Sequence, residues 1–341
     1  MKRFFFIVAS LCAPLIASAH EVYVLGRNVI AIDTMAPSPN PFGAIAGNEM
    51  QFLFWGFIAV LTVSTVFAAS IFHTFEKRFD PTLRRLKKYA PLSARLTLGV
   101  CLIACAFYQG LFGPELPFAQ FAGAYAPVLT GLFYALGTLV LVGYYTRVAA
   151  LVAVAVFGLA VAHYGIYMLT YTNYLGEMLV LAILGGYSHG LHTRAHDIGR
   201  HYFARLSRRM EPYAFLIARV AFGVAVMFAA FYAKFLHSDL ALDTIRDYHL
   251  TNYFHFDPLF IVLGAFIIES LIGLFFILGI EVRWTALFFL FWLFLSLIYF
   301  GEAVWPHLVL VGLNITMFLH GYDRYTLEGY FFGKRGREPV L

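Results

Sequence analysis

The sequence contains few charged residues for its length. Only 13% of its 341 residues are charged, whereas 61% are hydrophobic and 18% are aromatic. Soluble domains contain about 25% charged and about 45–50% apolar residues. This shortage of charge excludes a cytosolic enzyme, a nucleic-acid-binding module and a disordered scaffold. The composition predicts an integral membrane protein in contact with membrane lipid, and it predicts no nucleic-acid partner.

Cysteines and recognisable catalytic motifs are also scarce. Cys101 and Cys105 lie four residues apart on one apolar stretch, a spacing typical of buried packing residues, and Cys12 is the third cysteine. The sequence has no Cys-x-x-Cys motif, phosphate-binding glycine loop, zincin motif or nucleophile elbow. No soluble domain is large enough to bind a flavin or a dinucleotide. Redox work would therefore require a partner subunit that carries other cofactors.

The N-terminal residues 1–19 have the pattern of a cleaved signal peptide. Two basic residues precede the apolar run 4–16, and the small-x-small sequence 17–19 follows. We expect the mature chain to begin at His20 and residues 20–48 to form an irregular extracytoplasmic segment. A mature His20 would offer an amine and an imidazole that suit copper, and the sequence leaves this open.

Nine apolar stretches follow, each long enough to cross about 30 Å of hydrocarbon. They run over residues 51–73, 92–113, 127–145, 148–169, 174–190, 212–236, 258–279, 284–301 and 305–320. The signal peptide and the positive-inside rule agree on their direction, because nearly all loop and tail Lys and Arg then lie inside. We expect a multi-pass protein of the bacterial cytoplasmic (inner) membrane. Its mature N-terminus would lie outside and its tail, residues 322–341, in the cytoplasm.

Residues 92–190 and 212–321 look like two copies of one four-helix unit. The matched residues are Arg95 and Gly99 with Arg219 and Gly223, Gly143 and Arg147 with Gly279 and Arg283, and His189-Gly190 with His320-Gly321. Because each unit holds an even number of spans, both would cross the membrane in the same sense as parallel repeats. The expected fold is an all-α polytopic membrane protein with one helix followed by two parallel four-helix repeats.

The second unit contains a distinctive series of residues. In chain order these are Arg219, Lys234, Glu269 with the glycine-containing apolar run to Gly279, and the turn Gly279-x-x-x-Arg283-x-x-Ala286. In this pattern residues 212–321 resemble the DoxX-like family of membrane proteins. The family is named from subunits of a terminal quinol oxidase and of thiosulfate:quinone oxidoreductase, to whose DoxD subunit the unit is similar. The resemblance implies quinone-linked redox function.

The first unit resembles a diverged copy, because it keeps Arg95, Gly143 and Arg147. Phe133 stands at the position of Glu269, and Gly110 at the position of Lys234. Any site built on the acid and the lysine is therefore expected in the second unit alone.

Glu269 is the most informative candidate residue. It lies about 11 residues into its span, or about 16 Å deep at 1.5 Å per residue. A carboxylate at that depth must be paired or protonated. We expect it to be a catalytic, proton-exchanging or quinone-contacting acid that acts with His307 and pairs with Arg219 or Lys234. A structural hydrogen bond between helices is the alternative.

Four further groups are candidates for substrate binding or proton transfer. Glu177 would be shallower and reachable from outside, and His163 and His307 are expected near the outer surface. Asn314 lies two turns below His307 on the same helix face. Two histidines on facing helices can ligate haem, but helix capping at the interface is the simpler reading, so we expect quinone rather than haem.

Metal binding has little support in the sequence. His192 and His196 are spaced i, i+4 but lack a carboxylate framework, and we expect no metal site. The outer loop 237–257 is rich in His and Asp. It would be a solvated loop or a docking site for a periplasmic partner.

Three functions remain open at this point. The first is a quinone-linked oxidoreductase subunit with a redox partner. The second is a proton-coupled small-molecule transporter, and the third is a non-catalytic membrane assembly protein. The sequence identifies no electron donor, transported solute or oligomeric state.

Overall fold

The computed structural model describes residues 37–45, 51–185, 207–255, 257–301 and 304–333. The described residues are almost entirely helical, and their one β-bridge joins Gly110 to Pro117. Several predicted features lie outside the described residues: the expected signal peptide, His20, the end of the tail, and the basic loop with His189, His192 and His196.

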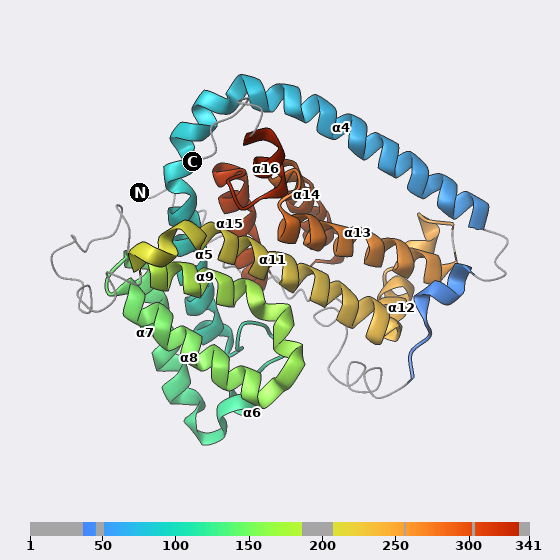
Figure 1. Cartoon of the computed structure of the whole chain (residues 1–341). Helices are drawn as coiled ribbons and strands as arrows, with labels where there is room; N and C mark the ends of the chain where they lie inside the picture. The colour runs from blue at the N-terminus through green and yellow to red at the C-terminus, as the bar shows by residue number, and fades with distance from the viewer. Residues whose placement is uncertain (1–36, 46–50, 186–206, 256, 302–303, 334–341) are drawn as a thin grey trace.

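The first half of the chain contributes six α-helices to the described structure. They are α4 (Gln51–Leu86), α5 (Ala90–Tyr108), α6 (Phe118–Ala122), α7 (Ala126–Val142), α8 (Thr146–Tyr164) and α9 (Thr172–Leu184), with the 3-10 segment η4 (Gly165–Tyr171) between the last two. The helix α4 extends well beyond the expected end at residue 73 and runs along the outside of the bundle (Figure 1). Its Glu76 is buried and forms an ion pair with Arg283, which fastens the second half of α4 to the start of α14.

The second half begins with the short η6 (Glu211–Tyr213) and continues with longer helices. They are α11 (Ala214–Phe231), the π-helical turn η7 (Tyr232–Leu236), α12 (Ser238–Asp247), η8 (Leu250–Asn252), α13 (Pro258–Leu278), α14 (Val282–Phe300), α15 (Val304–His320) and α16 (Leu327–Gly333). Proline stands in the first turn of α5, α7 and α13, where it costs no helical hydrogen bond.

Each of the nine predicted apolar stretches contains an α-helix. Seven helical stretches of the described chain are long and apolar enough to cross a membrane, namely 54–76, 81–108, 118–142, 146–184, 207–236, 258–278 and 282–300. The stretch 146–184 contains both α8 and α9, and α15 is a shorter apolar helix. The all-α, multi-pass membrane class is thus confirmed, while the count of nine spans stays a prediction.

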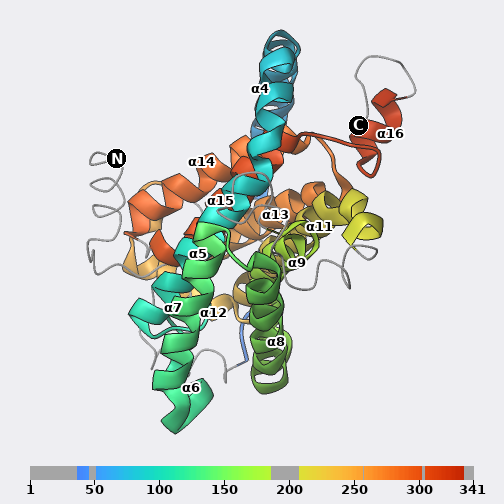
Figure 2. The ribbon, with the colours of Figure 1, turned by 90° about the vertical axis from the view of Figure 1, so that its left-hand side faces the viewer.

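The helices pack in matched pairs along the two halves of the chain. α5 packs on α7 as α11 packs on α13, and across the halves α9 packs on α11 as α15 packs on α5. α7 and α8 lie side by side in the first half (Figure 2). At Gly223 and Gly273 the backbones of α11 and α13 are so close that an added Cβ would lie within 2.5–2.7 Å of the opposite carbonyl oxygen.

The turns before α8 and α14 have the same backbone conformation. Gly143 and Gly279 have φ of 76° and 72°, and the residues two positions later have φ of 46° and 44°. Arg147 then donates to the Ile183 carbonyl at 3.3 Å, as Arg283 donates to the Phe318 carbonyl at 3.1 Å. These carbonyls are at the ends of α9 and α15, where helical oxygens lack partners.

Comparing the ends of α9 and α15 in the same way corrects the sequence alignment of the two halves at one position. Gly185 lies against Arg147 as Gly321 lies against Arg283, and both glycines have φ of 72°. The residue equivalent to Gly321 is therefore Gly185 rather than Gly190. Sequence letters alone favoured the later His-Gly pair because they do not show where α9 ends.

The loop 237–257, which we expect to lie outside, is more structured than predicted. Its residues 238–247 form the amphipathic helix α12, with Leu240, Ala241 and Ile245 buried. Ala241 and Ile245 pack against Val262 of α13. The expectation of a simple solvated loop is wrong, because the apolar residues recur with a helical spacing that buries one face.

Candidate functional site

An ion pair joins α13 to the end of α11 inside the second unit. Lys234 Nζ lies 2.9 Å from Glu269 Oε2. The lysine side chain is 6% exposed and the glutamate side chain 16% exposed. The structure therefore selects Lys234 from the two expected partners of Glu269, and it leaves one side of the carboxylate accessible.

A third residue completes the site from α14. Trp292 Nε1 donates a hydrogen bond to Glu269 Oε1 at 3.3 Å, so each carboxylate oxygen has its own partner. Sequence reasoning missed this residue. A signal was available, because Glu269 lies 12 residues before Glu281 in the α13–α14 turn and Trp292 lies 11 residues after it. Nearly equal distances from a helical hairpin turn place two residues at about the same depth.

The local backbone at Lys234 is unusual. Residues 232–236 form a π-helical turn that continues α11. Single π-turns within helices are rare and are frequent at functional sites, since the extra residue changes the direction of nearby side chains. The turn places Lys234, which is 5% exposed as a residue, beside the acid of α13.

The electrostatics of this site are those of a charge pair in a low dielectric. The pair attracts strongly there, but both groups have lost much of their hydration. A proton moving from Lys234 to Glu269 would leave two neutral groups, and a proton taken up by Glu269 would leave the lysine cation. The arrangement can therefore hold a proton, release it or accept a hydrogen bond from a hydroxyl at the open side of the carboxylate.

Phe133 and Gly110, which the sequence comparison aligns with Glu269 and Lys234, form no such pair. Phe133 is fully buried, and its ring lies 5.9 Å from that of Phe112 and 5.2 Å from that of Phe118. Gly110 takes part in the β-bridge to Pro117. The ion pair is thus a property of the second unit.

Arg219 lies far from Glu269. It donates to the carbonyl oxygens of Phe276, Ile277 at 2.9 Å and Tyr325 at 2.9 Å. Fifteen residues, or roughly 22 Å of helix at 1.5 Å per residue, separate it from Lys234. Its contacts satisfy the end of α13 and fasten the segment after α15, which is a structural role.

His307 and Asn314 are both buried on α15. The polar partners of Glu269 in the described residues are Lys234 and Trp292, so its expected joint action with His307 has no direct contact to support it and stays a prediction. The reason is that α15 packs chiefly on α5 and α14, whereas α13 packs on α11. Asn314 donates to the Leu310 carbonyl at 2.9 Å, and its own side-chain oxygen is buried without a hydrogen-bond partner.

His163 is exposed near the end of α8. Its ring meets the edges of Phe121 and Tyr164, with centroid distances of 5.6 Å and 4.6 Å. α8 packs on α7, α9 and η4 rather than on α15. The two histidines His163 and His307 are therefore not on facing helices as expected.

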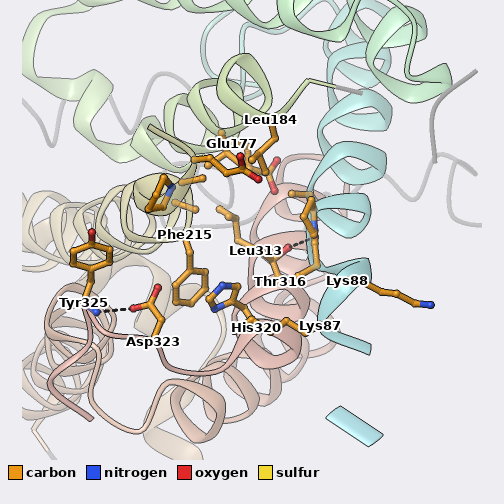
Figure 3. Close-up of a pocket in the computed structure, with 18 of the residues that line it drawn as sticks. Lys87, Lys88, Glu177, Leu184, Phe215, Leu313, Thr316, His320, Asp323 and Tyr325 are labelled. Atoms are coloured by element: carbon orange, nitrogen blue, oxygen red, sulfur yellow. Dashed lines mark hydrogen bonds between the residues drawn. The ribbon is translucent and has the colours of Figure 1, made fainter. Parts of the chain in front are cut away.

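Glu177 lies elsewhere, in a cavity of about 530 Å³ formed mainly by α5, α9, α11 and α15 (Figure 3). The acid is fully buried, and neither carboxylate oxygen has a hydrogen-bond partner. The cavity also touches Lys87, Lys88 and Arg324, which belong to segments predicted to lie inside. Under the predicted topology the space beside Glu177 therefore extends toward the inner ends of the helices, rather than toward the outside as expected.

The sequence did not predict a further polar cluster, which is formed by Glu115 and two tyrosines. Glu115 accepts hydrogen bonds from Tyr167, at 3.1 Å, and from Tyr171. The cluster ties the segment between α5 and α6 to η4, and it has no equivalent among the residues of the DoxX-like pattern. Within the described ranges, no group of three or more His, Cys, Asp or Glu side chains is arranged to hold a metal ion.

Comparison with known proteins gives one clear result. No curated protein and no solved structure matches the chain. Residues 214–302 match the DoxX family model. The matched segment begins with α11, contains Lys234, Glu269 and Trp292, and ends before α15. The resemblance is thus confirmed, and the second half of the chain contains a DoxX domain.

Proposed function

We propose that the protein is a membrane subunit of a quinone-linked oxidoreductase, in which Glu269 exchanges protons with bound quinol. The observation that carries the proposal is the Lys234–Glu269–Trp292 cluster inside the DoxX domain. The proposal includes the finer topology: a cleaved signal peptide, an outside N-terminus, two parallel four-helix units and a redox partner subunit in a bacterial inner membrane.

The residues around the cluster suit a quinone. The exposed side chains that follow Glu269 and surround Trp292 on the two helices are apolar: Leu271, Leu274, Phe291, Phe294 and Leu295. They offer a surface to an isoprenoid tail, and the 16% exposed carboxylate offers a hydrogen-bond acceptor to a ring hydroxyl. A bound quinol would supply two electrons and two protons.

The residues of the chain would handle the protons. The ion pair with Lys234 at 2.9 Å holds the carboxylate of Glu269 in place, with one side open to a ring hydroxyl. The hydrogen bond from Trp292 holds one carboxylate oxygen of Glu269 and so fixes the orientation of its carboxylate. In this proposal Glu269 accepts a proton from the quinol hydroxyl, and its contact with Lys234 is the route by which that proton leaves the site. Electrons would pass to a partner that carries its own cofactor.

A proton-coupled transporter is the second candidate function. It is favoured by the cavity beside Glu177, which lies between helices from both halves of the chain. An assembly role has less support, since α12 buries its apolar face on the chain's own α13 and presents a polar face to any periplasmic partner.

Tryptophan fluorescence tests the quinone proposal at the site itself. Quinones quench nearby indoles, and Trp292 is one of four tryptophans. We expect a decyl-benzoquinone to quench the purified protein saturably, and E269Q to weaken binding about tenfold, the loss of one charge-assisted hydrogen bond. W292F should lose most of the quenching amplitude.

The matched control is E211Q, which changes an exposed acid that lies outside the DoxX domain. It should bind the quinone as the wild type does. Equal quinone affinity in E269Q and the wild type would refute the proposed role of Glu269.

A further inference from the structure

The cavity beside Glu177 is built from equivalent parts of both halves of the chain. Ala90 and Ala94 of α5 face it together with Ala214 and Ala218 of α11. α9 and α15 supply the remaining walls, including Leu313. The small side chains on α5 and α11 leave the space open, and a volume of about 530 Å³ is within the range of small-molecule sites.

Glu177 is the one acid at the apolar part of this cavity. Figure 3 shows it on the opposite side from Asp323 and Tyr325. It is 0% exposed, and both of its side-chain oxygens lack hydrogen-bond partners. An ionised carboxylate without a partner is far too costly to bury, so the group must carry its proton. A protonated carboxyl has an O–H donor to offer to a molecule in the cavity.

The other titratable groups on the cavity walls do not neutralise it. They are Lys87 and Lys88 before α5, Glu211 before α11, His320 at the end of α15, and Asp323, Arg324 and Tyr325 after it. His320 stacks on Phe215 with ring centroids 3.6 Å apart, which separates the charged groups from the apolar part. Cys101 of α5 is also fully buried, and its thiol donates to the Trp305 carbonyl at 3.2 Å.

We propose that this cavity is a second ligand site, in which protonated Glu177 donates a hydrogen bond to an acceptor atom on a mainly apolar molecule. The site is separate from the Lys234–Glu269 cluster and does not depend on the quinone proposal. The apolar walls bind the body of the molecule, and the carboxyl group of Glu177 donates a hydrogen bond to its acceptor group. Ligands without an acceptor gain only the apolar contacts.

Dicyclohexylcarbodiimide tests both parts of this proposal, because it is apolar and reacts with protonated carboxyl groups. The carboxyl proton moves to a carbodiimide nitrogen as the carboxyl oxygen attacks the central carbon. Migration of the acyl group to nitrogen then gives a stable N-acylurea, and no atom is lost. We expect peptide mass spectrometry of the treated full-length protein to show the adduct on Glu177.

Competition with two matched probes measures the hydrogen bond. At equal mole fraction in the micelle, the ketone 2-undecanone should protect Glu177 from labelling at about fivefold lower concentration than undecane, the equivalent of one neutral hydrogen bond of about 1 kcal/mol. Equal protection by both would overturn the role of the acid as donor. Lack of protection by either would overturn the cavity as a ligand site.

Two variants complete the test. E177Q should remove the adduct at position 177 and unfold at the temperature of the wild type, since it replaces one neutral group by another. L184W, which fills part of the cavity wall, should reduce labelling of Glu177 while leaving quinone binding at Glu269 unchanged. An unlabelled Glu177 in the folded wild-type protein would refute the proposal without affecting the proposed function.

Discussion

Replacing Lys234 by methionine removes the cation from the DoxX-domain cluster while keeping much of its apolar length. Glu269 would then retain only the hydrogen bond from Trp292. Removing one partner of a buried ion pair costs about 3–5 kcal/mol. We expect about 3 kcal/mol, the lower end, because the side chain of Glu269 is 16% exposed and keeps some contact with its surroundings. E269Q should cost about as much, since it leaves the buried Lys234 without an anion.

A double-mutant cycle isolates the interaction between the two residues. If the pair acts as a unit, K234M/E269Q should be more stable than the sum of the single changes by about 2 kcal/mol. The assay is denaturant unfolding in mixed micelles. The control cycle uses Asp243 and Arg246, whose N–O distance is 2.5 Å but whose arginine side chain is 75% exposed, and whose coupling should stay below about 1 kcal/mol. Strictly additive effects at Lys234 and Glu269 would refute the reasoning.

Two other predictions concern packing and pH. G273A should destabilise the protein by at least about 2 kcal/mol, because the new Cβ would lie 2.7 Å from the Gly223 carbonyl oxygen. The control is G131A, whose Cβ would have nothing within 4 Å and which should be neutral or stabilising by up to about 1 kcal/mol. Thermal unfolding measures both changes. Burial, with Glu281 and Glu76 nearby, raises the pKa of Glu328 in α16 from 4.5 to about 8, against the opposing effect of Arg283. The folded state then binds more protons than the unfolded state between these values, so stability should fall as the pH rises from about 4.5 through 8. The Val282 amide donates a hydrogen bond to Glu328, so its protection from hydrogen exchange should fall over the same pH range in the wild type. E328Q should lose this pH dependence. An unchanged pH profile in E328Q would contradict the role given to Glu328.

The sequence was sufficient to predict elements whose signals are local. The apolar stretches gave the helices, and the Gly-x-x-x-Arg turns gave two sharp corners at positions where the structure has them. The pairing of Glu269 with Lys234 was one of two predicted alternatives. Lys234 rather than Arg219 is the partner because it lies at the same depth as Glu269. That depth depends on the direction and packing of α11 and α13.

Features that depend on packing between the halves were not predictable. Cys101 of α5 donates to the Trp305 carbonyl at 3.2 Å, which places the start of α15 against the first half and buries His307 away from Glu269. Glu177 was singled out by its sequence position, but the cavity beside it exists only where α5, α9, α11 and α15 meet. Hydrophobic periodicity predicts which face of a helix is buried, but it does not identify the helix against which that face packs.

The most direct test of the proposed function is a near-ultraviolet oxidised-minus-reduced difference spectrum of the protein purified from its native membrane. The account predicts a quinone signal in the wild type and in E177Q. It predicts loss of that signal in E269Q, with the variant still inserted and folded. An undiminished quinone signal in E269Q, or a wild type that shows none even after quinone is added, would contradict the assignment of Glu269 as the quinol-facing acid.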